Sequence, residues 1–319
     1  MTMTCDPLAR FAAGLDALID PGERVGVAVS GGPDSLALLL LVAATRPGQL
    51  AAATIDHGLR PGSAAEAASV ADLCASRGIP HQTLTVTVPS GASVQAQARE
   101  ARYAALGEWA TERGLAAVLT AHHADDQAET LLMRLARGSG LPGLAGIRPL
   151  HRHGLNGGRE VKIIRPLLDW RKSELQAIVA DARIKPADDP ANRDARHDRT
   201  RARETLAAHD WLDARRLAAS AAHLAEAEEA LALVADKLFA DRHRREGEGL
   251  VLAAADLPRE FQRRLLLHAF AASDTQPPRG PDLQRVLAVL KGAGTCTLGG
   301  LRLTGGTEWR LSQAPPRRR

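Results

Sequence analysis

Short apolar runs alternate with helical patterns along the first half of the chain. Strand-like runs occur at 25–29, 51–55, 82–88 and 115–120, and helix patterns follow them at 35–44, 64–76, 93–113 and 125–137. Strands that alternate with helices of this length predict a parallel sheet covered by helices on both faces. One more strand is predicted at 161–164, after a loop rich in Gly, His and Pro at 138–160.

The second half follows a different pattern. A short helix is predicted at 173–182, then a polar, arginine-dense segment at 184–203, and then Ala-rich helices at 204–243, 256–272 and 281–291. The last part, 295–311, alternates around two Gly-Gly pairs and predicts a small hairpin. We therefore expect an α/β domain at 1–210, a smaller, mostly helical domain at 211–314 and a disordered tail at 315–319.

Composition narrows the class of protein. The chain is 45% hydrophobic and 24% charged, which is typical of a folded soluble protein. Its longest apolar run, Leu36 to Ala44, is too short to span a bilayer, and no signal peptide is expected at the start. Three widely spaced cysteines without a CxxC pair argue against a cysteine-ligated zinc or iron–sulfur site and fit a cytoplasmic location.

The cations are unevenly distributed. Of 41 Lys and Arg residues only five are lysines, and none precedes Lys162, which excludes a Walker-type phosphate loop from the first half. Residues 1–161 carry 13 Arg against 15 acidic residues, whereas 162–319 carry 28 basic against 22 acidic residues. The basic second half suggests an anionic partner, foremost nucleic acid, although arginines spread over solvated faces would give the same count.

The strongest motif is Ser30-Gly31-Gly32-Pro33-Asp34-Ser35, between a buried strand and an apolar helix. The two glycines let backbone N–H groups approach an anion, and the helix N-terminus adds partial positive charge. Asp34 would repel bare phosphate, so its presence indicates Mg²⁺ between it and a nucleotide. The alternative is a Gly-rich turn with Asp34 as a helix cap; the complete pattern in this place favours the nucleotide site.

A second group of polar residues, from His122 to Thr130, follows the strand at 115–120 and opens the next helix. His122, Asp126 and Glu129 are spaced i, i+4 and i+7, which predicts one shared helix face. An imidazole and two carboxylates there could ligate a metal or grip a cationic substrate. Asp125 and Asp126 could also simply pair with the helix dipole. Both motifs should lie at the carboxyl end of the sheet, where open α/β sheets bind ligands.

Residues 30–35 resemble the PP-loop of the N-type ATP pyrophosphatases, which split ATP between the α- and β-phosphates and transfer AMP to an oxygen of the substrate. The stretch from His122 to Gly140 closely resembles a segment of the tRNA(Ile)-lysidine synthetase family. Further stretches agree with that family in the same order: 56–61, 98–103, 143–147, 165–168, 189–192 and 199–203. The resemblance covers residues 25–205 densely.

This resemblance implies a PP-loop ATP pyrophosphatase fold and a ligase that forms a carbon–nitrogen bond. ATP would adenylate O2 of the wobble cytidine in the CAU anticodon of an isoleucine tRNA. Free L-lysine would then displace AMP to give lysidine, which switches codon recognition from AUG to AUA. A homodimer is suggested, and no membrane is involved.

The resemblance also implies residue roles. The loop binds ATP through Ser30, Gly31, Gly32, Pro33, Asp34 and Ser35, with Asp34 facing Mg²⁺. Asp126 and Glu129 bind the lysine ammonium, and His122 lies near the reacting base. Arg99 and Arg102 neutralise charge at the adenylated intermediate. Arg199, Arg201 and Arg203 contact tRNA phosphates; without the resemblance, they could pair with Asp194 and Asp198 or solvate a helix.

Three rival functions fit the sequence less well. A tRNA thiolase of the same superfamily needs paired cysteines, which Cys5, Cys74 and Cys296 do not supply. A relative coupled to an amidotransferase would bring a nucleophilic cysteine motif, and none is present. A non-catalytic RNA-binding module needs neither Asp34 nor the carboxylates at Asp126 and Glu129.

Overall fold

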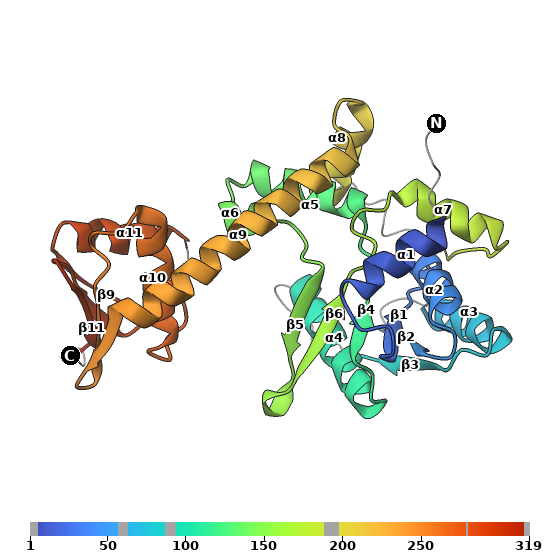
Figure 1. Cartoon of the computed structure of the whole chain (residues 1–319), viewed down its shortest axis with the longest axis horizontal. Helices are drawn as coiled ribbons and strands as arrows, with labels where there is room; N and C mark the ends of the chain where they lie inside the picture. Colours follow the sequence, from blue (N-terminus) through green and yellow to red (C-terminus); the bar gives the residue numbers. More distant parts are fainter. Residues whose placement is uncertain (1–5, 57–62, 87–93, 188–197, 279, 316–319) are drawn as a thin grey trace. The chain divides into compact units, whose positions relative to one another are not determined.

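The computed structural model describes residues 6–56, 63–86, 94–187, 198–278 and 280–315. Contacts divide the chain into two compact units, 1–225 (unit 1) and 226–319 (unit 2), and Figure 1 shows their elements. The division falls within the long helix α9 (Ala214–Arg242), which begins just after the predicted domain border at 210. That border stays a prediction.

Unit 1 is built on a six-stranded sheet with the order β3-β2-β1-β4-β6-β5. The strands are β1 (Val25–Ala28), β2 (Leu50–Asp56), β3 (His81–Thr85), β4 (Ala117–Leu119), β5 (Leu150–Gly154) and β6 (Glu160–Ile164). All neighbouring pairs are parallel except β5 with β6. β1 pairs with β2 on one side and with β4 on the other, so the strand order reverses beside β1. Ligands bind at such switch points in open α/β sheets.

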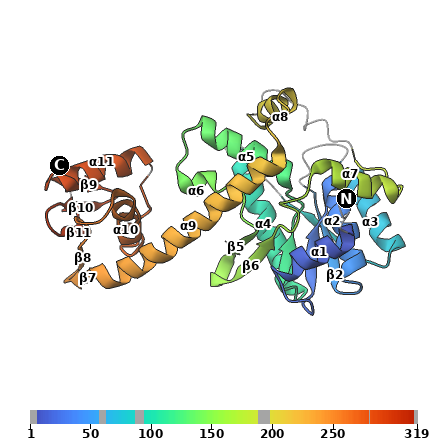
Figure 2. The same ribbon diagram turned by 45° about the horizontal axis from the view of Figure 1, so that its top comes forward.

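Helices pack on both faces of this sheet, as Figures 1 and 2 show. One apolar cluster joins alternate strand residues to α1 (Pro7–Asp16), α2 (Pro33–Thr45), α3 (Ser63–Ser76) and α7 (Lys172–Asp181). The other joins the opposite strand face to α4 (Val94–Glu112). Gly26 permits this packing, because a Cβ there would lie 2.5 Å from the Trp109 ring. The predicted two-faced parallel sheet is confirmed.

The remaining elements of unit 1 follow the fourth strand. They are α5 (Ala124–Ala136), α6 (Leu141–Leu144), the 3₁₀ turn η1 (Asn156–Gly158), α8 (Asp198–Ala208) and the first part of α9. Gln127 ties α5 to the following loop, because its amide donates to the Ile147 carbonyl and accepts from the Ile147 N–H, both at 2.7 Å. α8 packs against α5, which brings Arg199 and Arg203 to the acidic residues of α5.

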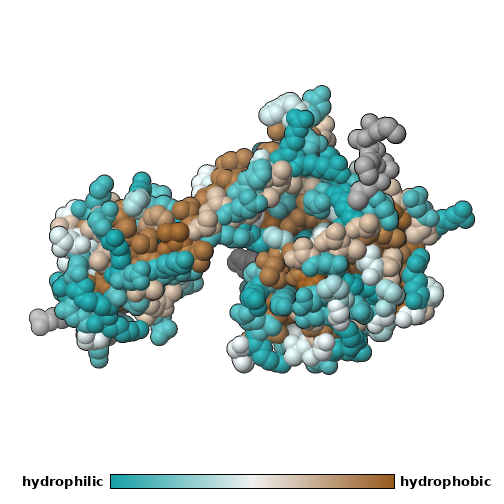
Figure 3. All heavy atoms as spheres, viewed as in Figure 1, coloured by the Kyte–Doolittle hydropathy of each residue, from teal (hydrophilic) through white to brown (hydrophobic). Residues whose placement is uncertain are grey.

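Unit 2 combines helices with a five-stranded antiparallel sheet of order β7-β8-β11-β10-β9. The strands are β7 (His243–Glu246), β8 (Gly249–Leu252), β9 (Thr295–Leu298), β10 (Leu301–Thr304) and β11 (Trp309–Gln313). α10 (Arg259–Ala271) and α11 (Gly280–Lys291) supply the rest of a core that contains Phe270 and Trp309. Hydrophobic side chains also gather along the middle of α9 in Figure 3, where Leu233 and Val234 are exposed.

Three strands were not predicted from the sequence. β5 (LHRHG) and β7 (HRRE) are mostly exposed edge strands, so neither shows an apolar alternation. β8 was identified as a strand only from its pairing with β7 and β11 in the structure. The predicted hairpin at 295–311 is part of this larger sheet. Most of the predicted tail and the motif at 189–192 lie outside the described residues, and within the described ones no helix is long and apolar enough to cross a membrane.

Candidate active site

The loop between β1 and α2 wraps tightly on itself. Ser35 Oγ accepts the Ser30 N–H at 3.1 Å and donates to the Gly32 carbonyl at 3.0 Å, and the two serine hydroxyls are 3.2 Å apart. Gly31 has φ +83°, a left-handed conformation that favours glycine. Gly32 caps α2 and Pro33 occupies its first turn, so the free N–H groups of the helix start face the same place as the loop.

Asp34 lies in the first turn of α2 and faces the second motif. Its Oδ2 is 3.5 Å from Nε2 of His123, whereas its Oδ1 is buried without a hydrogen-bond partner. A buried carboxylate oxygen without a donor is suited to a hard cation, which prefers oxygen ligands.

The chain leaves β4 at Leu119 and reaches α5 through Thr120 to His123. His122 therefore precedes the helix and does not share a helix face with Asp126 and Glu129, contrary to the spacing argument. His122 Nδ1 is 3.0 Å from the Thr120 hydroxyl oxygen. Burial, together with the charges of Arg165, Arg102, Arg99 and Arg199, holds the pKa of His122 well below its usual value, so its ring is neutral at pH 7.

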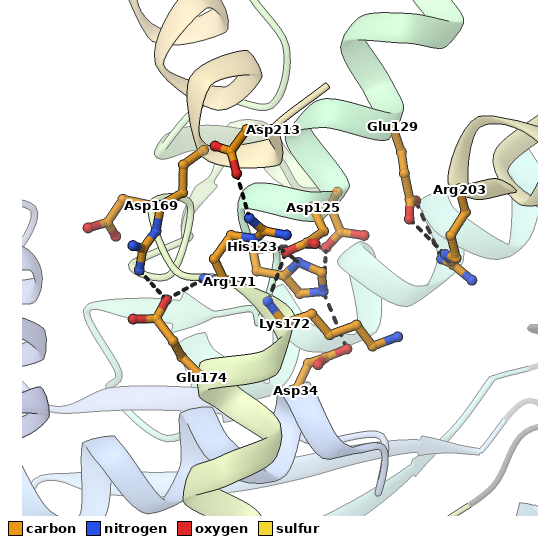
Figure 4. A network of polar contacts seen from close by, with 12 residues as sticks. Asp34, His123, Asp125, Glu129, Asp169, Arg171, Lys172, Glu174, Arg203 and Asp213 are labelled. Carbon is orange, nitrogen blue, oxygen red and sulfur yellow. Dashed lines mark hydrogen bonds and ion pairs between the residues drawn. The ribbon is translucent and has the colours of Figure 1, made fainter. Parts of the chain in front are cut away.

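His123, which sequence reasoning passed over, is at the centre of the acidic group in Figure 4. Its side chain is 5% exposed and lies within 3.6 Å of carboxylate oxygens of Asp34, Asp125 and Asp126. Burial alone would lower the pKa of His123, but contacts with Asp125 and Asp34 and the charge of Asp126 outweigh it and raise the pKa to about 10. The only signal in the sequence was the doublet His122-His123 at the end of a strand.

Asp125 faces away from the loop and binds the start of α7. Its Oδ2 accepts the Lys172 N–H at 2.8 Å and lies 3.4 Å from Nε of Arg171. Burial alone would raise the pKa of Asp125; contacts with His123, the Lys172 N–H and Arg171 lower it far below the usual range. Lys172 also lines the cavity and makes no ion pair with a described residue, so α7 brings to the site a lysine that the loop lacks.

Glu129 is buried under α8. Its Oε1 accepts from Nε of Arg203 at 2.8 Å, and its Oε2 is 3.0 Å from Nε of Arg199. The Glu129 side chain is 3% exposed, whereas those of Arg199 and Arg203 are 48% and 40% exposed. In this structure the predicted lysine-binding carboxylate is therefore neutralised by two of the predicted tRNA-binding arginines. Arg201 is exposed, and Asp198 pairs with Arg137 instead.

A cluster of arginines lies beside His122. The guanidinium carbons of Arg99 and Arg102 are each 5.0 Å from the centre of the Tyr103 ring, and Arg165 is buried nearby. None of the three arginines forms an ion pair with a residue in the described part of the chain. No carboxylate among the described residues neutralises this cluster, which suits an anionic ligand.

These groups surround one cavity of about 560 Å³ at the carboxyl ends of β1 and β4. Ten of the predicted site residues line it: Ser30, Gly32, Pro33, Asp34, Ser35, Arg102, His122, Asp126, Arg199 and Arg203. Gly31, Arg99, Glu129 and Arg201 do not line it. The two motifs, about 90 residues apart in the chain, therefore line one cavity at the carboxyl end of the sheet, where both were expected.

The oxygen ligands that the cavity residues offer fit magnesium only when a nucleotide is also bound. Among the described residues, no group of three or more His, Cys, Asp or Glu side chains is arranged to hold a metal ion. Mg²⁺ commonly takes one or two carboxylates and completes its shell with phosphate oxygens and waters. Asp34 would supply such a carboxylate. Neither described cysteine lines the cavity: Cys74 is in the core, where burial raises its pKa to about 11, and Cys296 is in β9.

Comparisons with known proteins agree with this geometry. A family model described as a PP-loop domain matches residues 7–209. The tRNA(Ile)-lysidine synthase of Novosphingobium aromaticivorans is 49% identical over 97% of this chain and 94% of its own length. The chain belongs to the tRNA(Ile)-lysidine synthase family. The tRNA(Ile)-lysidine synthase of Zymomonas mobilis is 43% identical over 93% of this chain and 90% of its own length.

A solved structure shows the same fold. The U34-tRNA thiolase NcsA from Methanococcus maripaludis with its [4Fe-4S] cluster aligns with a TM-score of 0.53 at 16% identity, over 70% of this chain and 77% of that one. At this identity the likeness concerns the fold alone. Family membership confirms the resemblance to the lysidine synthetases, and the PP-loop match confirms the predicted ATP-binding fold.

Proposed function

We propose that this protein converts the wobble cytidine of a CAU-anticodon tRNA(Ile) to lysidine, using ATP and free L-lysine. The observation that carries the proposal is one cavity lined by the PP-loop, the acidic start of α5 and Arg102 of the arginine cluster, in a chain of the lysidine synthase family. In the first step, O2 of the cytosine attacks the α-phosphate of ATP and pyrophosphate leaves. In the second, the lysine ε-amine attacks C2, loses a proton and expels AMP.

The PP-loop and α2 would bind the phosphates of ATP. The N–H groups at the start of α2 and the Ser30 hydroxyl are directed at the cavity, and Lys172 adds a cation from α7. Mg²⁺, held by Asp34 when the nucleotide is bound, would neutralise charge on the phosphates. Arg102, with Arg99 behind it, would stabilise the negative charge on the α-phosphate of the adenylated intermediate.

The lysine side chain would enter on the acidic side of the cavity. Asp126 lines it and would take the ammonium first. Glu129 would take part if one guanidinium of Arg199 or Arg203 gives way, an exchange of one cation for another that preserves the charge balance. His122, neutral and bound to the Thr120 hydroxyl, would accept a hydrogen bond from the attacking amine.

The tRNA would contact exposed cations outside the cavity. Arg201 and the half-exposed Arg199 lie on α8, and the domain predicted at 211–314 would add contacts from the basic second half. We place the enzyme in the cytoplasm, where its tRNA, ATP and lysine occur together, and expect a homodimer from the family resemblance.

The deciding experiment incubates the protein with ATP, Mg²⁺, radiolabelled lysine and a CAU-anticodon tRNA(Ile) transcript. We expect label in the tRNA and release of one pyrophosphate per lysine incorporated. Asp34→Ala should abolish pyrophosphate release, while Asp6→Ala, at the start of α1, serves as a carboxylate control. Folded protein that leaves the tRNA unlabelled would refute the proposal.

A further inference from the structure

Hydrogen bonds of the backbone hold His123 in place independently of its side-chain contacts. Its N–H donates to Asp126 Oδ2 at 3.1 Å and its carbonyl accepts the Gln127 N–H at 3.1 Å. The next N–H, of Ala124, donates to the Trp170 carbonyl at 2.8 Å, and His123 bridges to Leu167 as in a parallel sheet. The backbone of His123 is therefore fixed where β4 passes into α5, and this places the ring at one wall of the cavity.

The two ring nitrogens face different partners. Nε2 lies 3.5 Å from Asp34 Oδ2 and 3.6 Å from Asp126 Oδ2, while Nδ1 lies 3.6 Å from Asp125 Oδ2. Figure 4 shows the ring between Asp34 below it and Asp125 beside it. In the described part of the chain, no other side chain is at ion-pair distance from Asp34. His123 thus links the PP-loop to α5.

Asp34 needs such a link. It lies on a helix start beside two other carboxylates, and like charges this close repel one another. Contact between Nε2 and Oδ2 leaves Oδ1 buried without a hydrogen-bond partner. The ring therefore orients Asp34 so that one oxygen is used inside the protein and the other stays available for a cation.

We propose that His123 is a positioning residue: through Nε2 it aligns Asp34 of the PP-loop with Asp126 of α5, so that the loop can bind the magnesium form of ATP. The inference rests on the proposed function and extends it to a residue that acts through the carboxylate of Asp34. Residues behind metal-binding carboxylates commonly change metal affinity by about 10–100-fold when they are removed.

The test measures ATP binding by calorimetry over a magnesium titration, without tRNA or lysine. His123→Ala should weaken Mg²⁺-dependent ATP binding by about 10–100-fold and leave the weak binding in EDTA unchanged. His123→Gln should recover most of the loss, because its amide nitrogen can occupy the place of Nε2. His123→Asn, whose amide reaches only the place of Nδ1, should not. His153→Gln, at a buried histidine on β5 outside the cavity, is the matched control.

A double-mutant cycle separates positioning from folding. In an Asp34→Asn background, His123→Ala should cause no further loss of magnesium dependence. Thermal melting of the His123→Gln variant shows that the comparison concerns folded protein. Recovery by Asn instead of Gln would overturn the inference, since the ring would then act through Asp125. Unchanged or tighter magnesium-dependent binding in His123→Ala would also overturn it. Wild-type protein without magnesium-dependent ATP binding would refute the proposed function itself.

Discussion

Glu129 illustrates how a residue that the sequence predicts to be part of a site can have partners that the sequence does not show. Its place after Asp126 marks it as a member of the acidic group, yet Arg199 and Arg203 already neutralise it in the structure. Under the proposed function, the lysine ammonium would have to displace one of these two guanidiniums to reach Glu129. A buried carboxylate that loses its partner is costly, so the exchange must be nearly balanced.

We expect Glu129→Gln to impair lysine use more than nucleotide binding. The amide keeps the shape but loses the charge that holds an ammonium, so KM for lysine should rise at least about tenfold, which is 1.4 kcal/mol. The dissociation constant for ATP should change less than about threefold. Steady-state kinetics and calorimetry measure the two constants. Glu204→Gln, at an exposed glutamate of α8, is the control. Equal losses of lysine use and ATP binding would contradict the assignment.

At the scale of elements, the site depends on how α7 is held next to α5. Glu174 in the first turn of α7 accepts the Arg171 N–H at 2.7 Å and pairs with Arg215 of α9 at 2.6 Å and with Arg10 of α1 at 3.0 Å. One carboxylate thus joins three helices of unit 1. Arg171 and Lys172 at the start of α7 contact Asp125, so any movement of α7 is passed to the acidic group.

Glu174→Gln should destabilise unit 1 in a pH-dependent way. Burial alone would raise the pKa of Glu174, but the Arg171 N–H, Arg215 and Arg10 lower it below the usual value. Its contribution is therefore present above the unfolded pKa of about 4.3 and is lost as the pH falls through the folded pKa. We expect a loss of about 1 kcal/mol at pH 7, allowing for partial exposure.

Urea unfolding of both proteins between pH 7 and pH 3.5 measures this effect. The difference in free energy of unfolding should shrink towards the acid end of the range. Glu112→Gln, at an exposed glutamate at the end of α4, should show no difference at any pH. A loss that is the same at every pH would mean that the charge of Glu174 has no part in holding α7.

At the scale of the whole molecule, the excess of basic residues in the second half of the chain consists of two kinds of cation: those in ion pairs and those without a described partner. Many arginines of unit 2 form ion pairs, such as Arg244 with Glu308 and Arg264 with Glu228. Lys291 at the end of α11 and Arg302 on β10 are exposed and pair with no described carboxylate. Only cations of this second kind can release counterions from a nucleic acid without first losing an internal partner.

Replacing both residues, Lys291→Gln with Arg302→Gln, should weaken tRNA binding and lower its salt dependence. The slope of log K against log salt should become shallower by about two, one unit for each lost phosphate contact. Filter binding from 50 to 200 mM salt measures the slope. The control is Arg24→Gln with Arg77→Gln. These two arginines precede β1 and β3, at the end of the unit 1 sheet that lies away from the cavity. An unchanged slope would exclude these positions from the tRNA interface.

Much of the fold could be predicted from local pattern. Buried strands and apolar helices can be recognised in the sequence, because the apolar residues that favour these elements locally are also the residues that pack in the core. β5 and β7 could not be predicted, since polar edge strands are stabilised by their neighbours alone. His123, Lys172 and Arg165 were missed for the same reason: their importance comes from residues that lie far from them in the chain.

The sequence by itself determined the PP-loop, the acidic start of α5 and the family, because each depends on neighbouring residues in the chain. Tertiary structure decided which side chains meet across the cavity. Side chains that packing brings together neutralise or orient one another according to their distance and burial. The spacing of residues along the sequence gives neither the distance nor the burial. That is why Glu129 is paired with two arginines and why His123, rather than His122, stands between the loop and the helix.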